Sequence, residues 1–115
     1  MKKLATIFVG TILSLVISNN AQAAFSCDTT VLKVLVYSGG NVNIRHSGRN
    51  DYTVICNLRA ERQGVSITTC AMWTSMLQNI KKNNGTAQFY YSGEGSCATL
   101  PTYAASPVPA YIGDM

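Results

Sequence analysis

Four cysteines behind an export signal constrain this chain more than any other feature of its sequence. Two lysines follow the first methionine, an apolar run extends over Leu4–Ile17, and the small-residue motif Ala21-Gln22-Ala23 comes next. This order is typical of a bacterial Sec-type signal peptide. The run is shorter than the roughly 20 apolar residues of a membrane-spanning helix. We predict a signal peptide over residues 1–23 and a single secreted or periplasmic domain over residues 24–115, without a membrane span after processing. A retained N-terminal anchor is the alternative.

The cysteines predict a domain that is stapled by disulfides. Removing residues 1–23 from the 115-residue chain leaves 92 residues. A domain of this size buries only roughly 60–65% of the surface that its unfolded chain exposes. An even number of cysteines in an exported chain indicates two disulfides, and four cysteines allow three pairings. We favour Cys56–Cys70, which flanks a plausible hairpin, and Cys27–Cys97, which would tie the two ends of the domain together.

Alternation of apolar and polar residues predicts a sheet of short strands. We expect a hairpin whose turn, Ser38–Asn41, contains two glycines that can adopt positive φ. The expected inward sets are Leu32, Val34 and Val36 on the first strand, Val42 and Ile44 on the second, and Tyr52, Val54, Cys56 and Leu58 on the third. The predicted strands cover residues 30–37, 41–45, 51–59, 65–67, 86–91 and a short edge near 110–113.

One amphipathic helix is predicted between the fourth and fifth of these strands. Thr68 or Thr69 can cap its start. Its apolar stripe consists of Trp73, Met76, Leu77 and Ile80, spaced at i, i+3, i+4 and i+7, so Trp73 is expected in the core. Two lysines occupy the last turn, and Asn83-Asn84-Gly85 offers residues that tolerate left-handed φ.

The order of these elements predicts a mainly β fold with one helix. A single amphipathic helix can close the open end of a curled antiparallel sheet, as in small OB-like Greek-key barrels. The predicted architecture is therefore a disulfide-stapled antiparallel OB-like barrel with the order strand, strand, strand, short strand, helix, strand. One helix packed on an open sheet is the alternative.

Several short motifs of this chain resemble those of known bacterial proteins. The segments ICNL at 55–58, CAMWTSML at 70–77, GTAQFYY at 85–91 and SCATLPTY at 96–103 resemble a group of small exported bacterial proteins, mostly of unassigned function. Residues 55–91 are also similar to the receptor-binding B subunit of subtilase-type toxins. This second resemblance implies an OB-like barrel that forms a ring and binds surface glycans. It supplies no sugar-binding residue, and Cys27 and the Gly39-Gly40 hairpin depart from the toxin pattern.

The titratable residues do not form a recognisable catalytic or metal motif. The cysteines are spaced by 29, 14 and 27 residues without a C-x-x-C pair, and His46 is the one histidine. Structural zinc sites need closer ligand spacing, and a disulfide-bonded sulfur cannot act as a nucleophile. The acidic residues fall in predicted loops or at strand ends, whereas a glycosidase needs a pair across a cleft. We expect no enzyme activity, no cofactor and no metal.

The charge balance argues against nucleic acid as a partner. Without the signal peptide, seven Lys and Arg residues face five Asp and Glu residues, and the one adjacent cationic pair is Lys81-Lys82. Nucleic-acid binding usually needs a basic stripe or patch.

Residues around the loop 46–50 are the sequence's candidates for binding. Arg45, Arg49 and Tyr52 bracket this loop, in which His46 is expected to be solvated. On the strand 86–91, Tyr90 is expected to point outward, opposite to its neighbours Phe89 and Tyr91. The interpretation is a secreted, non-enzymatic module that recognises a glycan or a protein surface, with a homo-oligomer as an option. The alternative is a periplasmic inhibitor or immunity-type protein with one protein partner.

Overall fold

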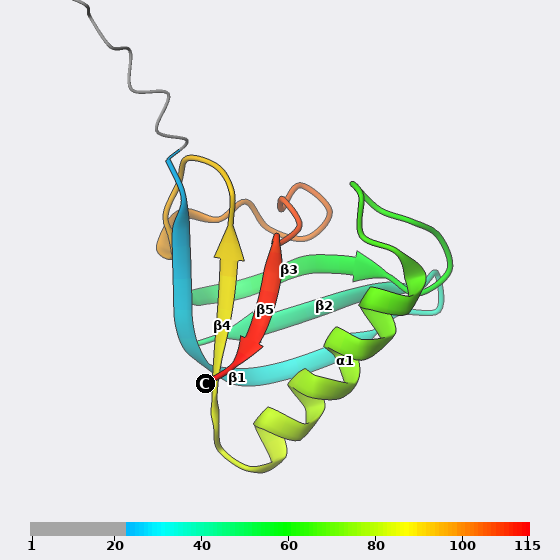
Figure 1. The fold of residues 1–115 in the computed structure, drawn as a ribbon, viewed down its shortest axis with the longest axis horizontal. Coiled ribbons are helices and arrows are strands. Elements are labelled where there is room, and N and C mark those ends of the chain that lie inside the picture. Colours follow the sequence, from blue (N-terminus) through cyan, green and yellow to red (C-terminus); the bar gives the residue numbers. More distant parts are fainter. Residues whose placement is uncertain (1–22) are drawn as a thin grey trace, which may run out of the picture.

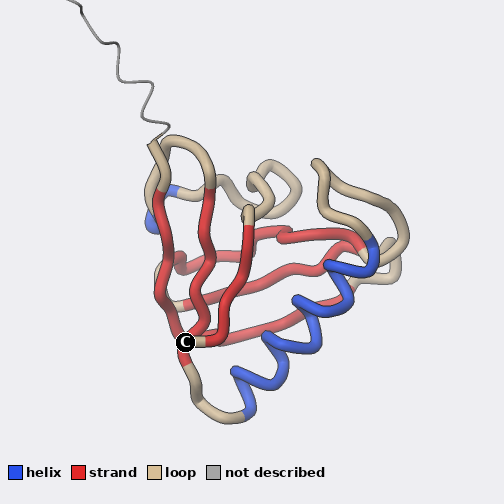
Figure 2. The backbone as a smooth tube through the Cα atoms, viewed as in Figure 1, coloured by secondary structure: helices blue, strands red, loops and turns tan. Residues whose placement is uncertain are grey.

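The structure is a computed structural model that describes residues 23–115 (Figures 1 and 2). Except for Ala23, the predicted signal peptide lies outside these residues. Five strands form one antiparallel sheet in the order β3-β2-β1-β4-β5, and one helix precedes β4. The elements are β1 (Phe25–Val36), β2 (Asn41–His46), β3 (Arg49–Asn57), α1 (Ile67–Lys82), β4 (Thr86–Tyr91), a short 3-10 helix (Cys97–Thr99) and β5 (Tyr111–Asp114).

The long strand β1 joins two halves of the sheet. Residues 25–30 of β1 pair with β4, whereas residues 31–36 pair with β2. The register shifts between Val31 and Lys33, which makes Leu32 the extra residue of a β-bulge. In Figure 1, β1 bends at its middle, and β4 and β5 run across β2 and β3. The mainly β fold with one helix is therefore confirmed.

The bulge overturns the predicted inward face of β1. Cys27, Thr29 and Val31 are buried before the bulge. Leu32, next in the alternation, is 40% exposed, and the extra residue then reverses the alternation, so from the predicted set only Val34 packs against the core. Val36, also predicted to point inward, is 50% exposed near the end of the strand.

Strands β2 and β3 confirm part of their predicted pattern. Val42 and Ile44 are fully buried, and Cys56 is buried beside them. A second register shift, in β3 between Cys56 and Val54, makes Ile55 an extra residue that also enters the core. The predicted common face of β3 is therefore wrong. Tyr52 and Val54 lie on the outer face of the sheet by register, although Val54 is still buried there.

Helix α1 begins two or three residues earlier than the predicted cap at Thr68 or Thr69 would place it. The Ser66 hydroxyl accepts a hydrogen bond from the backbone N–H of Thr69 at 3.1 Å, so Ser66 is the cap. The predicted strand 65–67 is wrong: Val65 makes a single bridge with Arg62 across a tight turn in which Gln63 and Gly64 have positive φ. Within the described residues, no helix combines the length and the apolar character needed to cross a membrane.

The apolar stripe of α1 faces the sheet as predicted. Trp73, Leu77 and Ile80 are buried in the core, and Met76 packs against it. Asn84, with φ of 54°, follows the end of the helix in a left-handed conformation. Strand β5 confirms the predicted C-terminal edge strand.

The sheet is curled but not closed, so the term barrel applies only loosely. Strands β3 and β5 are its two edges and do not pair with each other. Part of the β3 edge is covered by a parallel bridge between Thr53 and Tyr103. Figure 2 shows α1 along the open side between the two halves of the sheet.

Two disulfides link the sheet to the segments that pack against it. Cys27–Cys97 links β1 to the 3-10 helix, and Cys56–Cys70 links β3 to α1. These are the two favoured pairs, which are thereby confirmed. The first closes a sequence separation of 70 residues and the second a separation of 14.

Candidate functional site

The outward side chains of the sheet can be read from its strand register. Partner residues on neighbouring antiparallel strands project to the same face. In the half formed by β1, β4 and β5, Phe89 and its partners point to the core, so the alternate residues point outward. We call this outward set the aromatic face, and its members are Ser26, Asp28, Gln88, Tyr90, Tyr111 and Gly113.

The aromatic face is built around two stacked tyrosine rings. Tyr90 and Tyr111 are register partners on β4 and β5, with ring centroids 4.8 Å apart and an interplanar angle of 4°. Tyr111 is 45% exposed and Tyr90 is half-buried. The prediction that Tyr90 faces outward is confirmed. The sequence did not identify Tyr111 as its partner, because the pairing depends on the fold.

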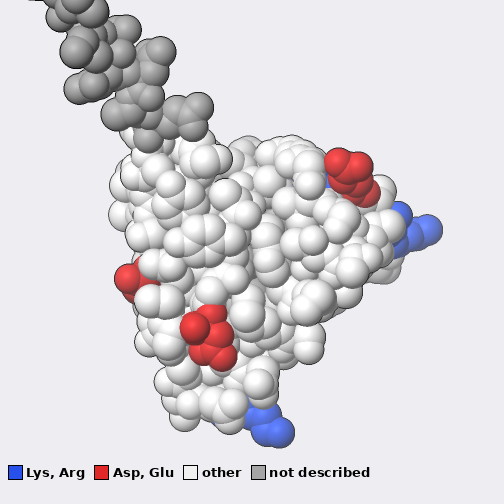
Figure 3. Space-filling view, viewed as in Figure 1, with Lys and Arg blue, Asp and Glu red and all other residues white. Residues whose placement is uncertain are grey.

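Polar groups border these rings on the same face. The Tyr111 hydroxyl donates to Gln88 Oε1 at 3.0 Å. Asp28 is the register partner of Gln88 on β1, and Gly113 is its partner on β5. Figure 3 shows one side of the molecule, on which charged groups are few and lie apart from one another.

A second outward set lies on the other half of the sheet. Arg45 is the register partner of Lys33 on one side and of Tyr52 on the other. Tyr103 lies next to Tyr52, with ring centroids 6.0 Å apart. We call Lys33, Arg45, Tyr52 and Tyr103 the basic row.

The structure brings together two of the three predicted binding residues. Arg45 and Tyr52 are neighbours in the basic row, and one guanidinium nitrogen of Arg45, Nη2, donates to Asn50 Oδ1 at 2.6 Å. Arg49 does not join them. Its Nε donates to the backbone carbonyl of Leu100 at 2.8 Å, so this half-buried side chain anchors the loop that follows the 3-10 helix.

His46 is not in a solvated loop, as the sequence predicted, but ends β2 in the core. It is 1% exposed and its imidazole stacks on Phe89 with centroids 4.8 Å apart. The loop is shorter than predicted because β2 and β3 are joined by the two-residue turn Ser47-Gly48. A Cβ atom at position 48 would lie 2.8 Å from the Thr29 side chain and 3.2 Å from the imidazole, so glycine permits this close approach.

Burial determines the protonation state of His46. The imidazole Nδ1 accepts a hydrogen bond from the Gly48 backbone N–H at 3.1 Å, and Nε2 is buried without a partner. Burial lowers the pKa of His46 from 6.5 to about 4, so the ring is neutral at pH 7. Tyr91 is also buried, with its hydroxyl unpartnered, and burial raises the pKa of this hydroxyl. Neither group is accessible to a ligand on either outer face.

The described residues contain no assembled metal site. Within residues 23–115, no three His, Cys, Asp or Glu side chains lie close enough together to hold an ion. All four cysteines in this part of the chain are in disulfides.

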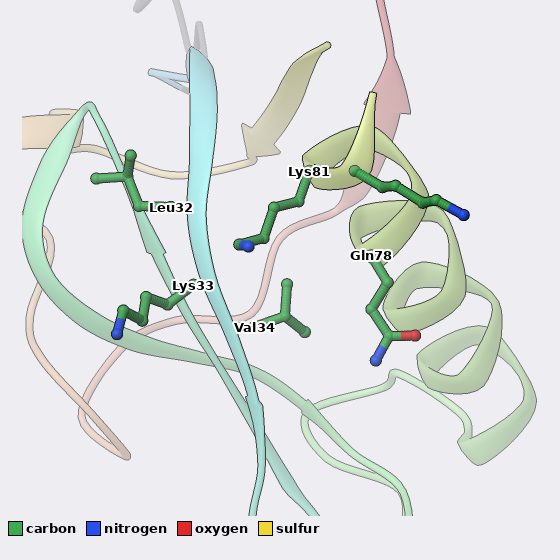
Figure 4. Close-up of a pocket in the computed structure, with 6 residues that line it drawn as sticks. Leu32, Lys33, Val34, Gln78 and Lys81 are labelled. Atoms are coloured by element: carbon green, nitrogen blue, oxygen red, sulfur yellow. The ribbon is translucent and has the colours of Figure 1, made fainter. Parts of the chain in front are cut away.

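A shallow hollow of about 410 Å³ lies between the bend of β1 and the end of α1. It is lined by Leu32, Lys33, Val34, Gln78, Lys81 and Lys82. Figure 4 shows Lys81 reaching from α1 toward β1, whereas the Lys33 side chain points away from the helix. The hollow therefore presents one inward ammonium group over a small apolar floor, which is too little to define a ligand.

Comparison with known proteins identifies no relative. No protein-family model, curated protein or solved structure matches this chain. Its function has to be inferred from its own residues and their geometry.

Proposed function

We propose that this protein is an exported, non-enzymatic binding module that recognises a glycan through its aromatic face. The observation that carries the proposal is the pair of parallel, outward-facing rings of Tyr90 and Tyr111. Sugar rings have an apolar face of C–H groups that packs well on an aromatic ring. Such a contact buries a large apolar area at a low cost in side-chain entropy.

Core packing does not account for these rings. The opposite face of the same strands supplies the core through Phe89 and Ile112, which are both buried. Tyr111 is 45% exposed on a four-residue edge strand, where an aromatic side chain is not needed to hold the sheet. Exposed aromatic groups that sit together on a rigid sheet are typical of recognition surfaces.

The polar neighbours of the rings match the hydroxyl groups of a saccharide. Gln88 Oε1 accepts from the Tyr111 hydroxyl, which leaves the Gln88 amide nitrogen available as a donor. Asp28 pairs with Gln88 in the register of β1 and β4, and its exposed carboxylate can accept hydrogen bonds. Gly113 adds no side chain over Gln88, so the polar groups stay open to a ligand beside the rings.

Binding suits this face better than catalysis. Asp28 is the one acidic member of the aromatic face, whereas glycoside hydrolysis uses two carboxylates that flank the scissile bond. This difference supports recognition of an intact glycan.

Two further lines support this proposal. Both disulfides are formed, which suits a small domain in an oxidising compartment and agrees with the export signal predicted over residues 1–23. Small curled sheets of the OB type bind oligosaccharides in other proteins, which is a fold-level analogy. The resemblance of residues 55–91 to a glycan-binding toxin subunit points the same way.

A glycan array with matched variants of the oxidised protein tests the proposal. We expect Tyr111→Ala to bind up to about tenfold more weakly than the unmodified protein, because a good aromatic contact contributes roughly 0.5–1.5 kcal/mol. Tyr111→Phe keeps the ring but loses the hydrogen bond to Gln88, so its binding should drop less. Tyr37→Ala is the control, since Tyr37 is 46% exposed outside the aromatic face.

Two outcomes would contradict glycan recognition at this face. The first is array binding that is equal in Tyr111→Ala and in the Tyr37→Ala control. The second is a blank array combined with capture of one defined protein partner, which would favour an inhibitor or immunity-type role.

A further inference from the structure

We propose that the basic row is a second and independent site, which binds a saccharide through a carboxylate carried on its ring, as in a uronic-acid chain. The row consists of Lys33, Arg45, Tyr52 and Tyr103, and it lies on the other half of the sheet from the aromatic face. Its ligand chemistry differs from that of the aromatic face, because it places cations beside aromatic rings.

The row is continuous across four neighbouring segments. Lys33 pairs with Arg45, and Arg45 pairs with Tyr52, through the register of β1, β2 and β3. Tyr103 continues the row beyond β3, because its N–H donates to the Tyr52 carbonyl at 2.7 Å. Directly opposed side chains on paired strands have Cβ atoms roughly 5 Å apart. The two cationic groups can therefore reach the same anionic group.

Within the described residues, the Arg45 guanidinium forms no hydrogen bond with a carboxylate. Its Nη2 donates to the neutral amide of Asn50, and its Nε is buried without an acceptor. This arrangement holds the guanidinium in one orientation. The exposed Lys33 adds a second positive charge beside it. A carboxylate is the group whose charge and planar geometry complement a positioned guanidinium.

Tyr103 occupies a backbone conformation that is costly for a tyrosine. Its φ is 51°, in the left-handed region that favours glycine. Its ring is 46% exposed, so core burial does not compensate for this conformation. Strained residues of this kind concentrate at functional sites. The Tyr103 ring lies beside Tyr52, with centroids 6.0 Å apart and an interplanar angle of 34°.

The loop that carries Tyr103 is held at several points. Arg49 donates to the carbonyl of Leu100, and Arg62 donates to the carbonyl of Ala104 at 2.7 Å. The Tyr103 carbonyl also accepts from the Val54 N–H at 3.2 Å. These bonds position the exposed ring before a ligand arrives, which reduces the entropy lost on binding.

The combination of two cations and two rings favours an acidic sugar over other anions. A pyranose ring packs against the aromatic side chains while its carboxylate meets the cations. Single-stranded nucleic acid needs a longer basic groove to follow its phosphates, and this row has two cations. An acidic peptide has no rigid apolar ring face to place on the tyrosines.

The test is a titration of the oxidised, isotope-labelled protein with oligogalacturonate, followed through its backbone amide NMR signals. We expect saturable shifts at positions 45, 52 and 103. The same oligosaccharide with methyl-esterified carboxylates is the matched ligand, and it should bind at least about tenfold more weakly because it has lost its charge. Affinity for the acid should also fall as salt is added.

Three variants locate the site. Arg45→Gln should weaken binding of oligogalacturonate at least about tenfold, and Arg45→Lys should have an intermediate effect, because lysine keeps the charge but loses the planar fork. Tyr103→Asn removes a ring at a position whose conformation asparagine tolerates. Arg59→Gln is the control, because it removes the same charge from an exposed arginine outside the row and should change the affinity less than about twofold.

The outcomes separate this proposal from the previous one. Tyr111→Ala should not change oligogalacturonate binding, so loss of array binding in that variant leaves the basic row untouched. Equal binding of the acid and its methyl ester, or an unchanged affinity in Arg45→Gln, would overturn the inference. Stronger binding of a sulfated oligosaccharide without carboxylates, an acidic peptide or single-stranded DNA at the same amides would also overturn it.

Discussion

The two halves of the bent sheet resemble each other inside and differ outside. Their inner faces supply a single core, in which Phe89 from one half and Ile44 from the other are both fully buried. On the outer side, the half with β4 and β5 presents parallel tyrosines with an amide and a carboxylate. The half with β2 and β3 presents cations and a tyrosine in a strained conformation. Packing explains the inner faces, and we propose that the exposed aromatic and cationic groups of the outer faces bind ligands.

Removal of each disulfide tests how much Cys27–Cys97 and Cys56–Cys70 contribute to the stability of the folded domain. We expect the largest changes in the free energy of unfolding from these replacements. Replacement of Cys27 and Cys97 by alanine should lower the free energy of unfolding by about 4 kcal/mol, and replacement of Cys56 and Cys70 by about 3 kcal/mol. The difference follows from the longer loop of the first pair, 70 against 14 residues, in the chain-entropy description. Urea unfolding of the two double variants measures both values. A larger loss for the shorter loop would show that packing of the buried sulfurs outweighs loop closure.

Acidification tests the junction between the two halves, where His46 of β2 packs on Phe89 of β4. The folded-state pKa of His46 is lowered to about 4 from 6.5, so the unfolded chain takes up the proton first as the pH falls. The contribution of His46 to stability is complete above pH 6.5 and declines between pH 6.5 and 4, by roughly 3 kcal/mol in total.

The matched variant is His46→Gln, which cannot titrate. Its unfolding free energy, measured by urea titration at several pH values, should vary much less between pH 4.5 and 6.5 than that of the unmodified protein. An equal slope in both proteins would mean that carboxylates, not the imidazole, cause the acid sensitivity.

We expect the smallest effect from a substitution of Tyr103 in the basic row. This substitution tests whether the strained backbone of Tyr103 or the packing of its ring matters more for stability. Tyr103→Asn should raise the free energy of unfolding by about 0.5–1 kcal/mol, because asparagine tolerates the left-handed conformation of this position. Thermal unfolding measures the change, with Tyr37→Asn as the control at an ordinary φ. A clear loss of stability in Tyr103→Asn would indicate that the contact between the Tyr103 and Tyr52 rings contributes more than the strain costs.

The sequence predicted those features correctly that a single simple pattern determines. The apolar stripe of α1, the two disulfide pairs and the Val42 and Ile44 face of β2 are confirmed. Each depends on a short-range rule: helical periodicity, cysteine count or strict alternation. Prediction failed at the bulges of β1 and β3, because one extra residue reverses the alternation and nothing in the local sequence marks its place.

The candidate surfaces were only partly accessible to sequence reasoning. Arg45 and Tyr52 stood out because they flank one loop, and the outward direction of Tyr90 followed from alternation. Tyr103 and Tyr111 lie in a proline-containing C-terminal region, and their ring partners come from strands far away in the chain. His46 was misplaced because its polar neighbours suggest a loop, whereas Thr29, Gly48 and Phe89 enclose it in the fold.

By itself, the amino-acid sequence determined a small domain with two crosslinks, a curled antiparallel sheet and one helix that covers its open side. These features follow from composition and periodicity, which act over a few residues at a time. The tertiary structure decided which residues become neighbours on the outer faces and which polar side chain is buried. The reason is that the bend of β1 and the strand order 3-2-1-4-5 place distant segments side by side, and only then do their side chains form a surface.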